Sequence, residues 1–219
     1  MRLLGKPFAQ ESLFEPEYCL GRNYSIAAIV KQRYIDDSKS FEFVSSAAIL
    51  STKWLIAKNI SIRIPDDAIF AAIGSKHWSK SGYLHRVGET VSIQGILILF
   101  KLEMDIIIPI DFLDLSGTLD IQQVRITTWG EQYKHEEALE TNYFLVDSSF
   151  CDEETFCAVK NSDDSTNMEY ALATSENYLY GFYNDSVYYQ NNACVHRFIS
   201  IRPYIFDITL YIKKNIFEL

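Results

Sequence analysis

Apolar residues occur in short runs along most of the chain, and small or polar residues separate one run from the next. The runs are rich in Ile, Val, Phe and Tyr, whereas Gly, Asp, Ser and Asn stand between them. This pattern is typical of β-strands joined by turns. Clear examples are YSIAAIVKQRY, FEFVSSAAIL, WLIAKNISIRI, GILILFKLE and DIQQVRITTW.

Only the last stretch, FDITLYIKKNIFEL, has helical spacing. Ile208, Tyr211, Ile212 and Ile216 would lie along one helix face, and Asp207 or Thr209 could cap the start. Many strands followed by a single helix predict an all-β barrel or sandwich protein with a C-terminal helix.

Length and charge narrow the classes of function. The 219 residues suffice for one large all-β domain or two small ones, and 48% of them are hydrophobic, so the chain can bury a sizeable core. A net charge of −9 argues against nucleic acid and against an anionic membrane surface as partners. There is no apolar run long enough for a transmembrane helix, and MRLLGKPFAQES is not a signal peptide. The protein is therefore cytoplasmic, or its numbering begins after a removed signal.

Cysteine and histidine spacing predicts no metal or other cofactor. No CxxC pair occurs, and the histidines show no metal-ligand spacing, although a zinc site built from scattered residues stays open. Cys151 and Cys157 could close a small loop. The residues concerned are Cys19, Cys151, Cys157, Cys194, His77, His85, His135 and His196.

Several blocks, in order along the chain, resemble blocks of the trypsin-like serine proteases. FEFVSSAAILSTKWLIAKNIS is similar to F-C-G-G-S-L-I-x-x-x-W-V-L-T-A-A-H-C, and MDIIIPIDFL to I-x-P-I-C-L. DIQQVRITTWGEQY resembles C-x-V-T-G-W-G, and YIFDITLYIKKNI resembles the family's C-terminal helix. SLFEPEYC looks like the tail that precedes the domain in secreted insect-type homologues.

The resemblance implies one trypsin-like domain over residues 1–219, made of two six-stranded antiparallel β-barrels. The expected N-terminal barrel covers 24–115, the C-terminal barrel 120–206 and the helix 207–219. The boundary is expected between Asp111 and Asp120, and the family suggests a secreted protein.

The same alignment predicts a degenerate catalytic triad. Ile60 stands at the histidine, Gly95 or Ile96 at the aspartate, and Ser165 at the nucleophile. Catalysis of this type needs a base to take the serine proton and a carboxylate to orient that base. The oxyanion glycines are also replaced, by Asp163, Thr166 and Asn167. His77 and His85 are expected in a loop.

Family cysteines are lost in pairs. Ser45 and Ser61 replace one implied disulfide, and Val124 and Ala171 replace another when residues are counted from Ser165. Cys151 with Cys157, or Cys157 with Cys194, are the bridges that could remain. Asp164, beside the expected nucleophile, has no identifiable ammonium partner from an activated N-terminus.

We therefore expect a pseudoprotease that binds another protein, as a regulator, decoy or adaptor in a protease cascade. An active hydrolase with a misaligned triad, or an unrelated β-rich intracellular interaction protein, are the alternatives. NYLYGFYNDSVYY is either an interface or a paired strand with one aromatic face inside; its candidate interface residues are Tyr178, Tyr180, Tyr183, Tyr188 and Tyr189. Glycosylation sequons begin at Asn23, Asn59 and Asn184.

Overall fold

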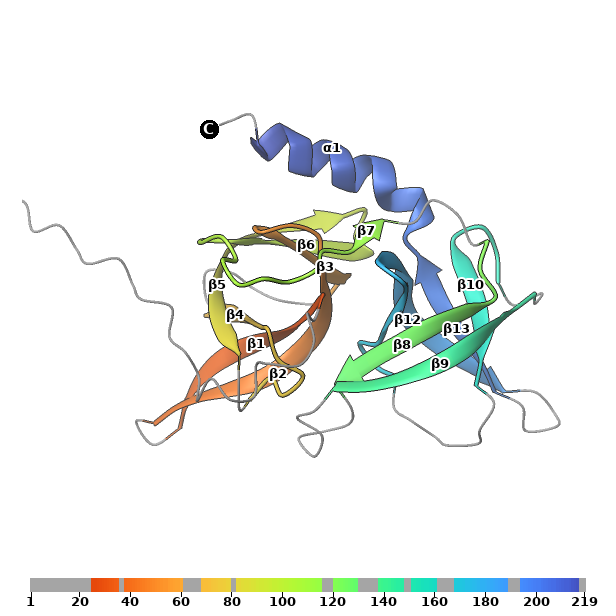
Figure 1. The fold of residues 1–219 in the computed structure, drawn as a ribbon, viewed down its shortest axis with the longest axis horizontal. Coiled ribbons are helices and arrows are strands. Elements are labelled where there is room, and N and C mark those ends of the chain that lie inside the picture. The colour runs from red at the N-terminus through yellow and green to blue at the C-terminus, as the bar shows by residue number, and fades with distance from the viewer. Residues whose placement is uncertain are drawn as a thin grey trace, which may run out of the picture.

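Six strands in the first half of the chain close into an antiparallel barrel (Figure 1). The computed structural model describes residues 25–35, 38–60, 68–79, 82–115, 120–129, 138–147, 151–160, 168–188 and 194–216. The barrel order is β1-β2-β3-β6-β5-β4, and pairing of β1 with β4 closes it. The strands are β1 (Ile26–Ile35), β2 (Ser38–Ile49), β3 (Trp54–Lys58), β4 (Ile69–Ile73), β5 (Tyr83–Ile93) and β6 (Leu97–Leu102).

A second closed barrel follows, so the predicted double-barrel fold is confirmed. Its order is β11-β8-β9-β10-β13-β12, and pairing of β11 with β12 closes it. The short β7 runs parallel to β12 and extends this second sheet, although its two residues fall at the end of the range expected for the first barrel. The strands are β7 (Asp114–Leu115), β8 (Gln123–Trp129), β9 (Ala138–Val146), β10 (Thr155–Val159), β11 (Leu172–Ser175), β12 (Tyr178–Tyr188) and β13 (Cys194–Ser200).

The chain ends in a helix that packs on the first barrel. A 3₁₀ turn (Arg202–Tyr204) leads directly into α1 (Ile205–Ile216). The helix thus begins before Asp207, and the expected cap at Asp207 or Thr209 is wrong, because Pro203 starts helical geometry earlier. Asp207 instead accepts a hydrogen bond from Gln94 at 2.7 Å.

Aromatic and polar contacts of Tyr211 fix the far half of the helix. Its ring meets Trp54 of β3 edge-on, with centroids 5.7 Å apart. Its hydroxyl donates to Glu89 of β5 at 2.9 Å. Ile208 on the same helix face is fully buried. Within the part of the chain that is described, no helix has the length and apolarity needed to cross a membrane.

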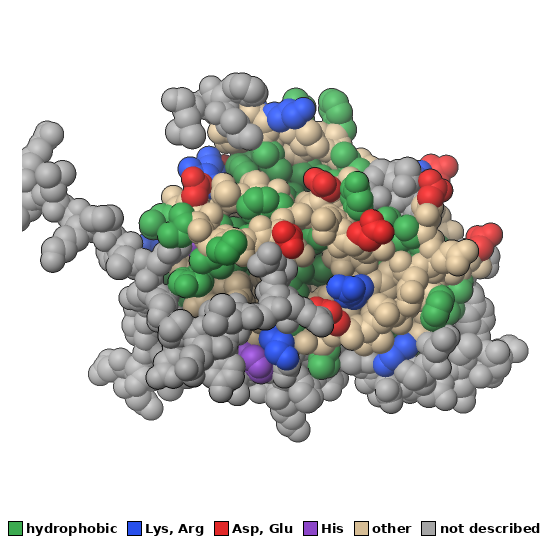
Figure 2. Space-filling view, viewed as in Figure 1, with side chains coloured by type: hydrophobic (Ala, Val, Ile, Leu, Met, Phe, Trp, Pro, Cys, Tyr) green, Lys and Arg blue, Asp and Glu red, His purple; other side chains and the backbone are tan. Residues whose placement is uncertain are grey.

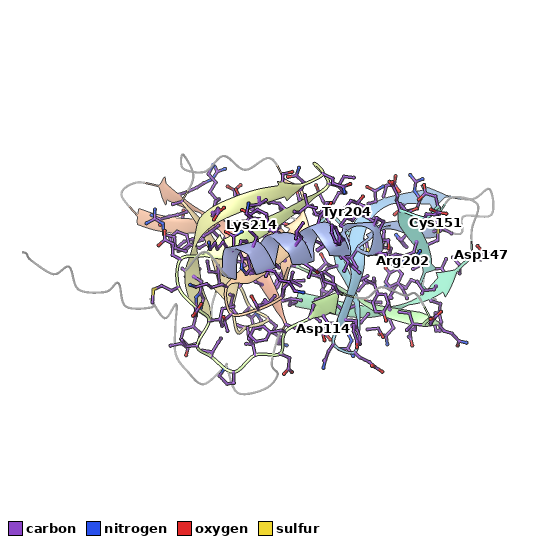
Figure 3. All side chains as sticks on the ribbon, turned by 90° about the horizontal axis from the view of Figure 1, so that it is seen from above. Asp114, Asp147, Cys151, Arg202, Tyr204 and Lys214 are labelled. Atoms are coloured by element: carbon purple, nitrogen blue, oxygen red, sulfur yellow. A yellow bond between two sulfur atoms is a disulfide. The ribbon has the colours of Figure 1, made fainter. Side chains whose placement is uncertain are left out.

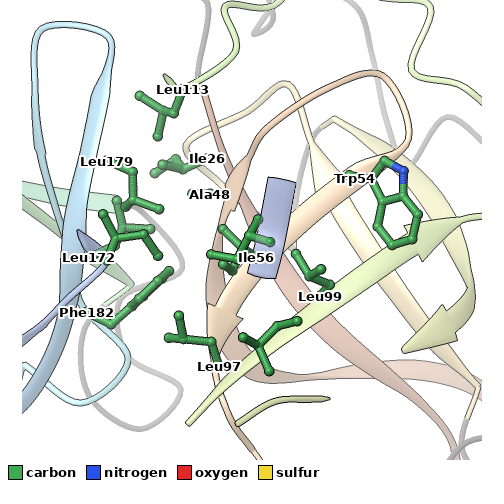
Figure 4. Packing of buried hydrophobic residues seen from close by; sticks show 14 of the residues in the cluster. Ile26, Ala48, Trp54, Ile56, Leu97, Leu99, Leu113, Leu172, Leu179 and Phe182 are labelled. Atoms are coloured by element: carbon green, nitrogen blue, oxygen red, sulfur yellow. The ribbon is translucent and has the colours of Figure 1, made fainter. Parts of the chain in front are cut away.

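Three hydrophobic clusters follow from the alternation of side chains along the strands. One fills the first barrel and draws on all six of its strands, and a second fills the other barrel. The third lies between the barrels and under α1, where Ile56 and Leu97 meet Leu172 and Phe182 (Figure 4). This junction cluster holds the two barrels together, and apolar burial is the force that does so.

His85 departs from the sequence prediction. It was expected in a loop, but it lies within β5 opposite Ala71 and is only 3% exposed. Burial lowers the pKa of the imidazole, against a smaller opposing effect of a backbone hydrogen bond at Met104. His85 is therefore a structural residue of the first barrel.

Candidate functional site at the barrel junction

Lys58 reaches from the first barrel to the second. It is the last residue of β3, after four buried residues of that strand. Its ammonium donates to the Tyr183 carbonyl oxygen at 3.2 Å, and to the carbonyl and side-chain oxygens of Asn184 at 3.4 Å each. All three acceptors belong to β12. A single side chain thus ties the end of β3 to the middle of β12.

An irregularity in β12 supplies these acceptors. Tyr183 pairs with Phe198 and Asp185 pairs with Arg197, so the register shifts at Asn184, which pairs with no residue of β13. A β-bulge of this kind leaves one residue outside the ladder and bends its strand. Lys58 binds the carbonyl oxygens of Tyr183 and Asn184, the two residues at this irregularity.

The surroundings of Lys58 are charged. Burial lowers the pKa of its ammonium, while Asp185 and then Glu169 act in the opposite direction. The Arg197 guanidinium hydrogen-bonds both carboxylate oxygens of Asp185 and lowers the pKa of that carboxyl. Glu169 in turn accepts a hydrogen bond from Tyr170, which contributes, after burial, to the raised pKa of the phenol. The junction therefore holds two cations and two carboxylates at one place.

Ile60 and the turn at Ile96 lie next to each other. The Asn59 backbone amide donates to the Ile96 carbonyl oxygen at 2.8 Å, and its side-chain amide donates to the Gly95 carbonyl oxygen at 2.8 Å. Gly95 has a φ of +74°, which suits glycine in a tight turn. Ile60 packs against the first-barrel core and Ile96 against the junction cluster, both partly buried. Neither side chain can bind or move a proton.

The expected nucleophile, Ser165, lies outside the described residues, as do Asp163, Asp164, Ser61 and His135. The pairing of β8 with β11 nevertheless gives information on where the nucleophile position lies along the chain. Thr174 pairs with Arg125 and Leu172 with Thr127, and continuing this register puts Ser175 opposite Val124. Ala171, the residue that the alignment pairs with Val124, lies four positions before Ser175, and both Ala171 and Val124 are buried in the second-barrel core. The same count of six residues, taken back from Ser175, reaches Glu169.

A separate hydrogen-bond chain links β12 and β13. The Tyr183 hydroxyl lies 2.7 Å from the Ser186 hydroxyl, which lies 2.8 Å from Nδ1 of His196. Burial, and secondarily Lys160, lower the pKa of His196, which favours the neutral imidazole. No carboxylate hydrogen-bonds to His196 among the residues that the structure describes. The pair has the donor and acceptor of a serine–histidine dyad without a group that orients the ring.

The cysteines and the tyrosine-rich stretch are placed as follows. Cys151, labelled in Figure 3, forms a disulfide with Cys157, the first of the two expected pairs. Cys194 is a free thiol. Tyr178 is 41% exposed, but Tyr180 is 6% exposed and lines the second-barrel core. The proposal of Tyr180 as an interface residue is therefore wrong, because its side chain packs in that core, next to the register irregularity between β11 and β12.

Two further expectations are only partly covered by the structure. Tyr183 is half-buried, whereas the side chains of Tyr188 and Tyr189 lie outside the described residues, as does the whole SLFEPEYC segment. Among the residues described, no three His, Cys, Asp or Glu side chains come together so as to hold a metal ion.

Lys58 and Asn184 were missed by sequence reasoning as parts of one site. The available signal was a lysine at the end of the apolar run WLIAK, because a charged residue next to a fully buried strand needs polar partners. The partner on β12 left no signal, since the residues are 126 positions apart.

Comparison with solved structures shows the fold. Kallikrein-related peptidase 10 superposes with a TM-score of 0.63 at 15% identity, over 87% of this chain and 96% of that one. A mutant of human heparin-binding protein gives 0.66 at 11% identity, over 86% and 91% of the two chains. A scabies mite inactivated protease paralogue, S-I1, gives 0.64 at 15% identity, over 85% and 95%.

At these identities the likeness establishes the trypsin-like double-barrel fold. No family model matches the chain, and no curated protein matches its sequence. The chemistry of the site must therefore be argued from its own residues.

Proposed function

We propose that this protein is a non-catalytic serine protease homologue that acts by binding another protein. The observation that carries the proposal is the ammonium of Lys58, held by three oxygen atoms of β12 at the barrel junction. A hydrolase of this type needs a neutral imidazole that can accept a proton from a serine. The hydrogen-bonded ammonium of Lys58 cannot accept a proton and so cannot act as the base. Its positive charge stabilises nearby carboxylates, not a histidine that must become positively charged.

The neighbours of Lys58 support the same reading. Ile60, two residues further on, is apolar, and Glu169 is close enough to affect the Lys58 pKa. We propose that Glu169, six residues before Ser175, occupies the nucleophile position in place of Ser165, in keeping with the β8–β11 register. A carboxylate there attracts the Lys58 ammonium electrostatically and is a poor substitute for an alkoxide nucleophile. Loss of the base alone removes several orders of magnitude in rate.

The fold is compatible with a protein that has lost catalysis. Among the structures that share it is a protease paralogue named as inactivated. The Cys151–Cys157 disulfide favours an oxidising compartment, and we propose that the protein is secreted. What remains of a protease without its chemistry is a stable double barrel with surface loops, which is suited to a regulator, decoy or adaptor.

Labelling with a fluorophosphonate probe tests the absence of catalysis. We expect no labelled serine at a probe concentration that labels active trypsin completely within minutes, and no hydrolysis of an ester substrate. Trypsin with its nucleophile changed to alanine is the matched negative control. Stoichiometric labelling of Ser165 would overturn the proposal and show that the triad is complete.

Ser186 and His196 favour a second candidate, a weak hydrolase built on β12 and β13. Their 2.8 Å hydrogen bond and the lowered His196 pKa give a neutral base next to a hydroxyl. If this dyad is active, the probe labels Ser186, and Ser186→Ala abolishes labelling while Ser165→Ala does not. We favour the non-catalytic reading because no carboxylate orients His196 in the described part of the chain.

Protein binding is tested with the folded protein as bait in fluid or tissue from the source. We expect a partner that is retained by the native protein, competed by soluble native protein, and lost when the bait is reduced, alkylated and unfolded. Recovery of the same set of proteins by folded and unfolded bait would refute a specific protein-binding role.

A further inference from the structure

Two separate surfaces expose large apolar side chains. One of them carries positive charges and the other carries negative charges. The first lies on α1 and is called the helix stripe. It consists of Phe206 and Leu210, flanked by Arg202 before them and by Lys213 and Lys214 after them. Phe206 is 74% exposed and Leu210 is 56% exposed. The spacing of four residues places Phe206, Leu210 and Lys214 along one side of α1, and Arg202 lies in the 3₁₀ turn that precedes the helix.

The helix stripe faces away from the molecule. The opposite side of α1 packs on the barrels through Ile208, Tyr211 and Ile212. Seen from above, Arg202 and Lys214 mark the two ends of the helix (Figure 3). The net charge of the chain is −9, so the three cations of the helix stripe set it apart from the average surface.

The second surface lies on the extended segment between β6 and β7 and is called the acidic segment. Leu113 and Ile106 anchor it through hydrogen bonds of 2.8 Å from their amides to Ile49 and Thr52 of the first barrel. Side chains alternate along it, so that the even positions from 106 to 110 pack inward and the odd positions face solvent. Its exposed residues include Met104, Asp105, Ile107, Asp111 and Phe112, and the exposed Asp114 follows at the start of β7.

Exposure on the acidic segment matches that on the helix stripe. Ile107 is 76% exposed and Met104 is 48% exposed. Lys53 lies 3.8 Å from Asp105, so part of the negative charge is offset locally. In Figure 2, apolar side chains gather over the first barrel with acidic side chains among them, and a cation lies at the upper edge where α1 runs.

We propose that the helix stripe of one molecule docks on the acidic segment of a second molecule of the same chain. Each surface offers apolar anchors with flanking charges, and the charges of the two surfaces are of opposite sign. Apolar anchors supply affinity, and complementary charge supplies orientation and association rate. This inference does not depend on the proposed function.

Pairing of one helix stripe with another is disfavoured by its charges. In an antiparallel pair, Arg202 of each copy would meet Lys213 and Lys214 of the other, and in a parallel pair like would meet like. Pairing of two acidic segments brings carboxylates together in the same way. The contact is therefore heterologous, and each dimer leaves one stripe and one segment available for a further copy.

Sedimentation velocity tests the contact on the full-length protein at about 10 to 500 µM. We expect the weight-average mass to rise with concentration and to fall when NaCl is raised from about 50 to 500 mM, because exposed charges are then screened. A stripe variant, Phe206→Gln with Leu210→Gln, keeps helix propensity and should weaken association about tenfold or more.

A segment variant, Ile107→Thr with Asp111→Lys, should weaken association to a similar degree. Phe144→Thr is the matched control, because Phe144 is 40% exposed on β9, away from both surfaces, and its loss should leave association unchanged. Unchanged circular dichroism and unfolding midpoints identify variants that are folded.

Mixing the two variants decides the geometry. Each variant keeps the surface that the other has lost, so equimolar mixing should form a 1:1 heterodimer that grows no further, whereas each variant alone stays monomeric. A wild-type protein that is monomeric over the whole concentration range overturns the proposal. So does association that survives both variants, or a mixture that stays monomeric although wild type associates.

Discussion

Gly181 offers a direct test of how tightly β12 is held against β13. It pairs with Ser200 across the two strands. A Cβ placed on Gly181 would lie 2.0 Å from the Ile199 carbonyl oxygen and 2.9 Å from Cε1 of Phe156. The first obstacle is backbone and cannot rotate away, so Gly181→Ala must push β12 off β13 or distort the strand.

The magnitude follows from what that movement disturbs. Leu179 and Phe182 on β12 are buried in the junction cluster, and Tyr180 is buried in the second-barrel core. Overpacking in a core costs about 1–3 kcal/mol, and a clash with backbone lies at or above the upper end. We therefore expect Gly181→Ala to lower the free energy of unfolding by about 3 kcal/mol or more, out of a total of about 5–15.

Gly95→Ala is the matched control because it makes the same chemical change without a clash. A Cβ there would meet nothing within 4 Å, and only its φ of +74° disfavours alanine. That strain is worth about 1 kcal/mol. The three tryptophans report unfolding in urea, and linear extrapolation gives each free energy. Equal losses for the two variants, or a smaller loss for Gly181→Ala, would refute the packing argument.

Further predictions concern the site, the disulfide and the surfaces. Lys58→Met should cost about 1–2 kcal/mol at neutral pH, measured by urea unfolding, because it removes three hydrogen bonds while relieving ammonium burial. Burial lowers the pKa of Lys58, so between that lowered pKa and the ordinary lysine value the unfolded state binds a proton that the folded state does not. The free energy of unfolding of the wild type should therefore rise with pH across this window. The rise that is due to Lys58 should be absent in Lys58→Met. Alkylation in denaturant without reductant should modify Cys194 but neither Cys151 nor Cys157, and modification of all three would disprove the disulfide; its reduction should cost about 2 kcal/mol. Fluorophosphonate labelling should fail at Ser165 and Ser186, and the stripe and segment variants should each weaken concentration-dependent association about tenfold or more.

Much of the fold could be predicted because it is encoded locally. Runs such as WLIAK and GILILFKL gave β3 and β6, and the spacing of Ile208, Tyr211 and Ile212 gave α1. These patterns report which side chains must leave water, and alternation or helical period then fixes the local backbone. The ordered blocks that resemble trypsin-like proteases added the arrangement into two barrels.

Errors arose where a local pattern has more than one solution. His85 stands in a stretch with polar neighbours and was assigned to a loop, yet pairing with Ala71 of β4 makes it part of β5. The helix started before Asp207 because Pro203 opens a 3₁₀ turn that no hydrophobic period marks. Tyr180 could not be told from Tyr178 by composition, since Tyr178 opens β12 and stays exposed whereas Tyr180 packs in the second-barrel core, a difference set by tertiary packing.

The sequence by itself determined the strands, the terminal helix and the absence of a histidine at Ile60. Only the tertiary structure decided what occupies the junction, because Lys58 meets Asn184 through the packing of one barrel on the other. Strand register likewise decided the partner of Val124, because continuing the β8–β11 pairing puts Ser175, not Ala171, opposite it. Hydrophobic pattern specifies which residues are buried, but a contact between residues more than a hundred positions apart depends on how whole barrels pack, which no local period records.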